Sequence, residues 1–396
     1  MLTHLGLSPS FGFGDRLGLA TPGHIAAVKG TKFAPIFAQQ SVRENSRTGR
    51  TPQQVLDDAR RAVDAAHWDA PWGADADHLK TPEDLPPFVE AGYTFFTVDP
   101  GSHVDNAADA DPLSVLQEKA KGQNWDELSA LYLGSDNGIK SIGAFESETL
   151  LRALVKYGRA IQHTATMYRR LSQMKDVFDF EVSVDETDSP TTPLEHFFIA
   201  NELTRLGARF TSLAPRFIGR FEKGVDYIGD LAALDAEMAK HAAVTAHFGT
   251  YKLSLHSGSD KFSVYPLTAK HWGERLHVKT AGTSYLEALR VLARLEPELF
   301  RKMLELSCSR YPTDRATYHV SAQLDMLPQT DDPSTGSGDA LPALLEDFHA
   351  REVLHVAFGS VLAAFGADLK AALLRHEDAY HEGLRLHFTK HLDLLK

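Results

Sequence analysis

Short hydrophobic runs recur along the first 295 residues, and most of them end in polar or ionisable side chains. Eight of these runs have the length and the content of β-branched and aromatic residues that are typical of strands. Apolar residues spaced by three or four positions fill most of the intervals, and this spacing predicts amphipathic helices. The eight predicted strands lie within residues 10–24, 33–45, 72–81, 93–106, 178–193, 208–224, 251–263 and 275–284.

Several helix ends are marked by single residues. Thr51 and Pro52 predict the start of a helix that reaches about Ala66, because threonine caps a helix N-terminus and proline suits its first turn. Two further helices should end at Gly207 and Gly249, since glycine commonly follows the last helical turn.

Strands that alternate with helices indicate an α/β fold with a parallel sheet, and eight such units point to a (β/α)8 TIM-like barrel. We expect the barrel to occupy residues 1–296, with a helical insertion at 107–177 after the fourth strand. Residues 297–396 should form extra C-terminal helices packed on the barrel, interrupted by a polar loop at 328–339. A doubly wound open sheet is the alternative, although neither a Gly-x-Gly-x-x-Gly turn nor a P-loop supports it.

Composition narrows the class of partner. The formal net charge is -12, from 41 basic and 53 acidic residues, which is not the positive field of a nucleic-acid or anionic-membrane binder. The single cysteine, Cys308, excludes an intramolecular disulfide and a cysteine-rich zinc site. The N-terminus shows no secretory signal. We therefore expect a cytoplasmic protein with a small-molecule substrate and no nucleic-acid or membrane partner, and a homo-oligomer remains open.

Alternation along the predicted strands shows which side chains point into the barrel. In the seventh strand, Tyr251 and the leucines face the outer helices, so Lys252 and His256 face inward. In the eighth strand, His277 and Lys279 face inward by the same rule. The third and fifth strands place carboxylates inward: Asp75, Asp77, Glu181 and Asp185.

Active sites of such barrels lie at the C-terminal ends of the strands. His78, His256 and His277 come from different strand ends and could form a three-histidine site for a divalent cation such as Zn, Ni, Mn or Fe. The carboxylates nearest to them are candidates for acid/base catalysis: Asp77, Asp185 and Glu186. The candidates for holding a substrate carboxylate are cationic: Arg43, Lys261 and Lys279.

Each assignment has a structural alternative. A histidine at a strand end is often only a hydrogen-bonding residue, and Asp77 could cap the helix that begins near Thr81. The remaining ionisable candidates could simply form ion pairs, Lys252 with Glu181 among them. We interpret three histidines in predicted helices as surface residues: His196, His241 and His247.

The chain resembles the tagaturonate epimerases over most of residues 10–295. The pieces that carry the resemblance are DADH at 75–78, VSVDETDSPTTP at 182–193, LHSGSDKFSVYP at 255–266 and LHVKTAGTSYLEALR at 276–290. HSGSDKFS is the most specific of them. The resemblance implies a metal-dependent isomerase that interconverts D-tagaturonate and D-fructuronate, which differ at C4, in hexuronate catabolism.

The resemblance also implies residue roles. Asp77 would be the proton acceptor, and His78, His256 and His277 the metal ligands. Glu186 would be the proton donor, although the strand alternation favours Asp185 as the inward-pointing member of that pair. The alternatives are a metal-dependent sugar isomerase or aldolase acting on a related keto-acid sugar, and a non-catalytic carbohydrate-binding barrel.

Overall fold

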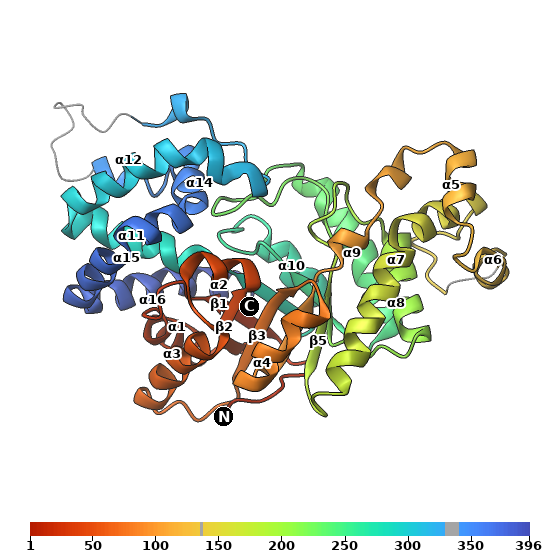
Figure 1. Ribbon diagram of the computed structural model, residues 1–396, viewed down its shortest axis with the longest axis horizontal. Helices are drawn as coiled ribbons and strands as arrows, with labels where there is room; N and C mark the ends of the chain where they lie inside the picture. Colours follow the sequence, from red (N-terminus) through yellow and green to blue (C-terminus); the bar gives the residue numbers. More distant parts are fainter. Residues whose placement is uncertain (135–137, 329–339) are drawn as a thin grey trace.

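Eight parallel strands close into a barrel in chain order, as predicted (Figure 1). The computed structural model describes residues 1–134, 138–328 and 340–396. Every strand side chain except those of Ala34 and His78 is buried, because helices cover the outside and the barrel interior is filled by side chains. The strands are β1 (Ser10–Gly14), β2 (Ala34–Ser41), β3 (Gly73–Leu79), β4 (Phe95–Val98), β5 (Asp179–Ser183), β6 (Ser212–Ala214), β7 (Lys252–Leu255) and β8 (Leu276–Thr280).

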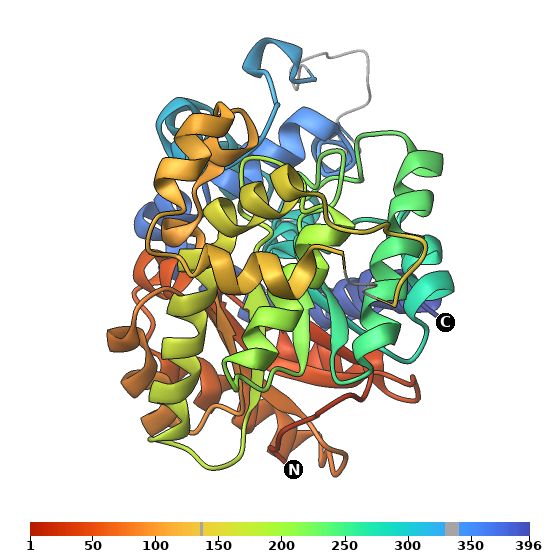
Figure 2. The same cartoon turned by 90° about the vertical axis from the view of Figure 1, so that its right-hand side faces the viewer.

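One or more helices follow each strand and form the outer layer (Figure 2). The predicted end signals are present: Thr51 accepts a hydrogen bond from the backbone of Gln54, while Gly207 and Gly249 adopt the left-handed conformation. These helices are α1 (Thr21–Val28), α2 (Val42–Thr48), α3 (Pro52–Ala65), α4 (Leu85–Ala91, after the 3-10 turn η1, Pro82–Asp84), α7 (Ser147–Ser172), α8 (Pro193–Arg205), α9 (Leu231–Phe248), α10 (Tyr265–Trp272) and α11 (Thr283–Leu295).

The segment between β4 and β5 is helical, as expected. Its last helix, α7, packs against α8 in the outer layer, whereas α5 and α6 stand at one end of the molecule (Figure 1). The elements before α7 are η2 (Gly101–His103), η3 (Asn106–Asp109), α5 (Leu113–Lys119) and α6 (Trp125–Tyr132).

The C-terminal region is also helical, and its last helix packs against α1 and α11. Its elements are α12 (Pro297–Asp314), η4 (Arg315–Thr317), η5 (Leu324–Met326), α13 (Ala340–Ala343), α14 (Phe348–Val356), α15 (Phe358–Arg375) and α16 (Glu377–Asp393). Of the predicted polar loop at 328–339, all but its first residue lies outside the described residues. Within the described parts of the chain, no single helix is long and apolar enough to cross a membrane, although α14 and α15, bent by 75°, pass that test as a pair.

Two of the three helical histidines are not surface residues. His196 and His241 are fully buried between α8 and α9, with their Nδ1 atoms 2.9 Å apart. Tyr251 completes the group through its hydroxyl, 2.9 Å from Nε2 of His196. Burial lowers the pKa of His241 to about 3, so the pair is neutral and its hydrogen bonds join two helices to the start of β7. His247 is exposed, as expected.

Candidate active site

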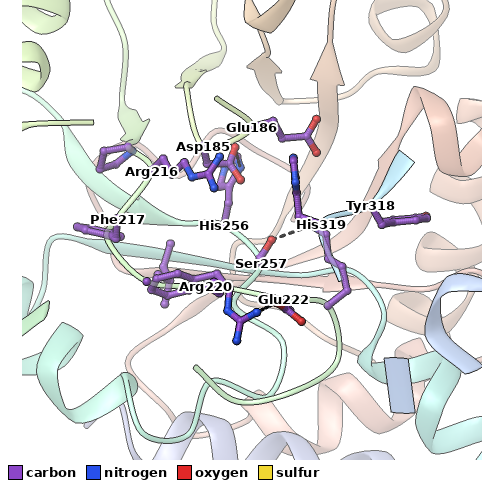
Figure 3. Close-up of a pocket in the computed structure, with 15 residues that line it drawn as sticks. Asp185, Glu186, Arg216, Phe217, Arg220, Glu222, His256, Ser257, Tyr318 and His319 are labelled. Carbon is purple, nitrogen blue, oxygen red and sulfur yellow. Dashed lines mark hydrogen bonds and ion pairs between the residues drawn. The ribbon is translucent and has the colours of Figure 1, made fainter. Parts of the chain in front are cut away.

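Two adjoining cavities open at the C-terminal ends of the strands, where a barrel carries its active site. The inner cavity is lined by the ends of β3 and β8, including Asp77, His78 and Lys279. The outer cavity, of about 280 Å³, is lined mainly by the loop after β6 and by Tyr318 and His319 (Figure 3). The wall that the two cavities share consists of Asp185, Glu186, Lys223, His256, Ser257 and Tyr318.

His78 reaches the inner cavity through an unusual backbone conformation. Strict alternation along β3 puts Asp75 and Asp77 inside and would turn His78 toward the helices. His78 has a φ of 54°, and the pairing register with β4 shifts between Ala76 and Leu79. A left-handed backbone at a non-glycine residue costs about 1–3 kcal/mol and is characteristic of functional sites. The distortion lets Nδ1 of His78 lie 2.8 Å from Oδ1 of Asp77.

His78, Asp185 and His256 bring three possible metal-ligand atoms within 4.8 Å of one another. Nε2 of His78 is buried, has no hydrogen-bond partner in the described chain, and lies 3.8 Å from Oδ1 of Asp185. The same carboxylate oxygen is 3.1 Å from Nδ1 of His256. Glu181 lies 2.6 Å from the other ring nitrogen, Nε2 of His256, in the way that outer carboxylates orient histidine ligands.

His277 lies deeper in the barrel than the sequence suggested. It pairs with Ser254 on β7, two residues below His256, and its Nδ1 is 2.9 Å from Oγ of Ser10. Its ring packs on Phe95, and burial lowers its pKa to about 3. His277 is therefore not part of the cluster formed by the two other histidines and Asp185.

Lys279 joins the carboxylates of three strands inside the barrel. Its Nζ lies 2.7 Å from Asp75, 2.7 Å from Asp77 and 2.9 Å from Glu181. Burial works to lower the pKa of Lys279, but the three carboxylates raise it overall. Burial alone would raise the pKa of Asp77, but the neighbouring His78 and Lys279 lower it overall. Asp77 is consequently an ionised carboxylate. Its side chain bonds to His78 and Lys279, so it does not cap the following helix.

The neighbours Asp185 and Glu186 have different surroundings. Asp185 is held by the Ser183 hydroxyl and by His256 inside the donor cluster. The side chain of Glu186 is 28% exposed, and its Oε1 lies 3.5 Å from Arg43 and 3.9 Å from His78. Burial raises the pKa of Glu186, but the neighbouring His78 lowers it overall. Both carboxylates line the wall that the two cavities share, and Glu186, 28% exposed against 15% for Asp185, is the more accessible of the two.

Of the three cations predicted to hold a substrate carboxylate, Arg43 and Lys279 line the inner cavity and Lys261 does not. Arg43 borders the inner cavity and sits 5.2 Å from the ring of Tyr318. Nζ of Lys279 is paired with three carboxylates inside the barrel. Lys261 is fully buried, lines neither cavity, and donates to three backbone carbonyls, at Glu222 (2.8 Å), Val225 (2.5 Å) and Ser259 (2.9 Å). Lys252, which is also buried, bonds to Ser8 and Ser10 rather than pairing with Glu181.

Sequence reasoning missed several residues of the outer cavity. Arg216 and Lys223 belong to PRFIGRFEKG, the loop after β6, and a predicted barrel already implies that such loops line the site. Tyr318 and His319 come from the C-terminal region, for which neither periodicity nor charge gave a signal.

Comparison with known proteins shows the family of the chain. A sequence model of the tagaturonate epimerase family matches residues 3–395. The tagaturonate/fructuronate epimerase of Thermotoga maritima is 46% identical over 400 residues, which cover 99% of this chain and 81% of that protein. The native crystal structure of fructuronate-tagaturonate epimerase UxaE from Cohnella laeviribosi has a TM-score of 0.95 at 39% identity, covering 100% of this chain and 83% of that one. Its complex with two glycerols gives a TM-score of 0.95 at 38% identity, with the same coverage. The chain belongs to the tagaturonate epimerase family.

Proposed function

We propose that the protein interconverts D-tagaturonate and D-fructuronate by inverting C4, using a divalent cation held at the barrel mouth. The relatives that match nearly the whole chain carry this activity in their names. The observation in the site that carries the proposal is the buried, unpartnered Nε2 of His78, which points at Asp185. A buried imidazole nitrogen without a hydrogen-bond partner is able to bind a metal ion. Nε2 of His277 is also without a partner in the described chain, but His277 lies outside the cluster of His78, Asp185 and His256.

The residues fit a metal ion. His78, Asp185 and His256 supply two imidazoles and one carboxylate, a donor set that suits Zn, Mn, Fe or Ni and leaves open positions for substrate oxygens. We therefore propose Asp185 as a ligand in place of His277. His277 would serve as a buried, neutral support for the barrel interior.

Inversion at C4 requires groups that accept and donate a proton, and the carboxylates of the site can do both. C4 of these sugars is β to the C2 ketone, so its proton is not acidified by simple enolisation. Cleavage of the C3–C4 bond, rotation of the aldehyde fragment and re-addition would invert C4. A bound cation would supply Lewis-acid charge to the ketone oxygen.

Asp77 and Glu186 would move the proton of the C4 hydroxyl. Asp77 is ionised, and its two bonds to His78 and Lys279 both use Oδ1, so we assign Oδ2 to accept the proton. Glu186, on the cavity side, is ionised in the resting site, so it would first have to take up the proton that Asp77 removes from the C4 hydroxyl and would then return it to the oxygen on the other face. Because an epimerisation runs in both directions, the carboxyl group that donates in one direction accepts in the other.

Metal analysis of matched variants tests the ligand set. We expect stoichiometric metal in the wild type and in His277→Ala, and loss of metal in folded His78→Ala, His256→Ala and Asp185→Asn. Metal lost from His277→Ala, His78→Ala and His256→Ala but retained by Asp185→Asn would restore the three-histidine interpretation. NMR of the products tests the reaction: equilibration of the two ketouronates supports the proposal, whereas accumulation of three-carbon fragments would show an aldolase. A cytoplasmic location and the oligomeric state remain predictions.

A further inference from the structure

In the inner cavity most cationic side chains are already paired with carboxylates, although the proposed substrate is an anion: Arg16 with Glu44, Arg43 with Glu186 and Lys279 with Asp77. Asp77, Asp185 and Glu186 all line this cavity, and two of the residues expected to neutralise a substrate carboxylate, Lys261 and Lys279, have their donors engaged inside the protein. A carboxylate group that enters this site needs cations that are not already neutralised, because close charges of like sign repel strongly in a partly buried cavity.

Lys223 has this property. It lies in the wall shared by the two cavities, half-buried, and its Nζ donates to Oγ of Ser257 at 2.7 Å. Within residues 1–134, 138–328 and 340–396, no carboxylate oxygen lies within 4.0 Å of this Nζ.

Arg216 is a second cation on the same loop. It is half-buried and lines the outer cavity next to Asp185 and His256 (Figure 3). The described residues give its guanidinium no ion-pair partner either, whereas the nearby Arg220 is paired with Glu222 at 3.2 Å. Two unneutralised cations therefore face the outer cavity from the loop after β6.

We propose that Lys223 and Arg216 bind the C6 carboxylate of the substrate in the outer cavity, so that C1 to C4 lie over His78 and Asp77 in the inner one. This assignment rests on the proposed function, since it takes the ligand to be a six-carbon ketouronate. It gives the two cavities separate tasks: the inner one performs the reaction, and the outer one recognises the acid end.

The arrangement also assigns a different task to Arg43. Its guanidinium is 3.5 Å from Glu186 and is flanked by Tyr318, so it holds the proposed acid in place. A guanidinium that is already paired is a poorer anchor for a substrate carboxylate than the unpaired cations of the β6 loop.

The test compares two ligands that differ only at C6. The wild type is first assayed for interconversion of D-fructuronate and D-tagaturonate by NMR, and its failure there would overturn the proposed function before any variant is made. KM for D-fructuronate and the inhibition constant of neutral D-fructose are then measured for the wild type, Lys223→Gln, Lys223→Arg and Arg216→Gln. Lys270→Gln, which removes an exposed lysine paired with Asp235 on the surface, is the control for the lost charge.

We expect KM for D-fructuronate to rise roughly tenfold to a hundredfold in Lys223→Gln and in Arg216→Gln, as expected for loss of one charge-assisted hydrogen bond. Lys223→Arg, which keeps the charge, should change KM by less than about fivefold. The inhibition constant of D-fructose should stay the same in all variants. An unchanged KM in both glutamine variants would overturn the assignment. A KM that rises together with the inhibition constant of D-fructose would also overturn it, because the residues would then only shape the cavity.

Discussion

Lys279 and Lys252 are inward-facing lysines on neighbouring strands, and replacing each of them by methionine should have very different effects. Lys279 lies within 2.9 Å of three buried carboxylates, on Asp75, Asp77 and Glu181. Removing the cation leaves these charges together without compensation, and breaking a buried ion pair in this way costs about 3–5 kcal/mol.

Lys252, by contrast, contacts only neutral oxygens, those of Ser8 (2.7 Å) and Ser10 (2.8 Å). Its replacement takes a donor from the carbonyl oxygen of Ser8 and from Oγ of Ser10, which keeps its contact with His277, at a cost of about 1–3 kcal/mol. It also removes a buried charge whose pKa burial has lowered to about 8, which offsets part of that loss. We therefore expect Lys279→Met to be at least about 2 kcal/mol less stable than Lys252→Met.

The pH dependence should separate the two variants further. Burial raises the pKa of Asp75 to about 7, against the lowering effect of Lys279. A carboxyl group with a raised folded-state pKa contributes stability that is fully present below its unfolded pKa, about 4, and is lost as the pH rises through 7. Without Lys279 this pKa rises further, so the stability deficit of Lys279→Met should grow between pH 6 and pH 8.5.

Urea denaturation followed by circular dichroism at these two pH values measures both effects. A free energy of unfolding for Lys279→Met within about 1 kcal/mol of Lys252→Met would refute the reasoning, as would a deficit that does not change with pH. If Lys279→Met does not accumulate in folded form, the double variant Asp75→Asn/Lys279→Met should recover stability, because it removes one of the stranded charges.

Three further outcomes are expected. Asp77→Asn should lower turnover by at least about a hundredfold, the usual effect of losing a catalytic base, with the metal content unchanged by elemental analysis; more than a tenth of the activity would contradict its role. Gly282→Ala should destabilise the fold by about 1–3 kcal/mol in thermal denaturation, because the new methyl group would lie 1.9 Å from Cε1 of His355; an unchanged melting temperature would show that this ring moves freely. Burial and the neighbouring Glu222 raise the pKa of Glu352 to about 8, so the free energy of unfolding of the wild type should fall as the pH rises through 8. Glu352→Gln stays neutral and should not show this fall. An equal change in the free energy of unfolding of both proteins from pH 7 to pH 9 would refute this.

Strand alternation predicted the inside of the barrel well, because a period of two needs only the residues of one strand. It placed Glu181, Asp75 and Lys279 on the inner face, and the structure joins them there. Alternation does not reveal how far one strand is shifted against the next. His277 faces inward as predicted, yet its pairing with Ser254 sets it below the level of the mouth.

His78 shows the opposite limit. Alternation alone turns it outward, and its place at the end of a predicted strand, together with the resemblance of DADH to an epimerase motif, marked it as a candidate ligand. The structure supplies the physical reason, a left-handed backbone with a shifted register at the end of β3. Such local strain is not visible in a hydrophobic pattern, because it is stabilised by the surroundings rather than by the residues that carry it.

The outer cavity was hardest to predict because two separate parts of the chain must meet to form it. Tyr318 reaches the mouth because the segment after η4 is fixed to the β6 loop: Ser321 donates from its backbone to Glu222 at 2.9 Å and to Glu352 at 3.0 Å. The same loop carries Lys223, so the segment and the proposed carboxylate anchor are held by one connection. The C-terminal region therefore forms part of the outer cavity, and a chain ending at residue 296 would lose the outer wall of that cavity even if its eight strands still closed.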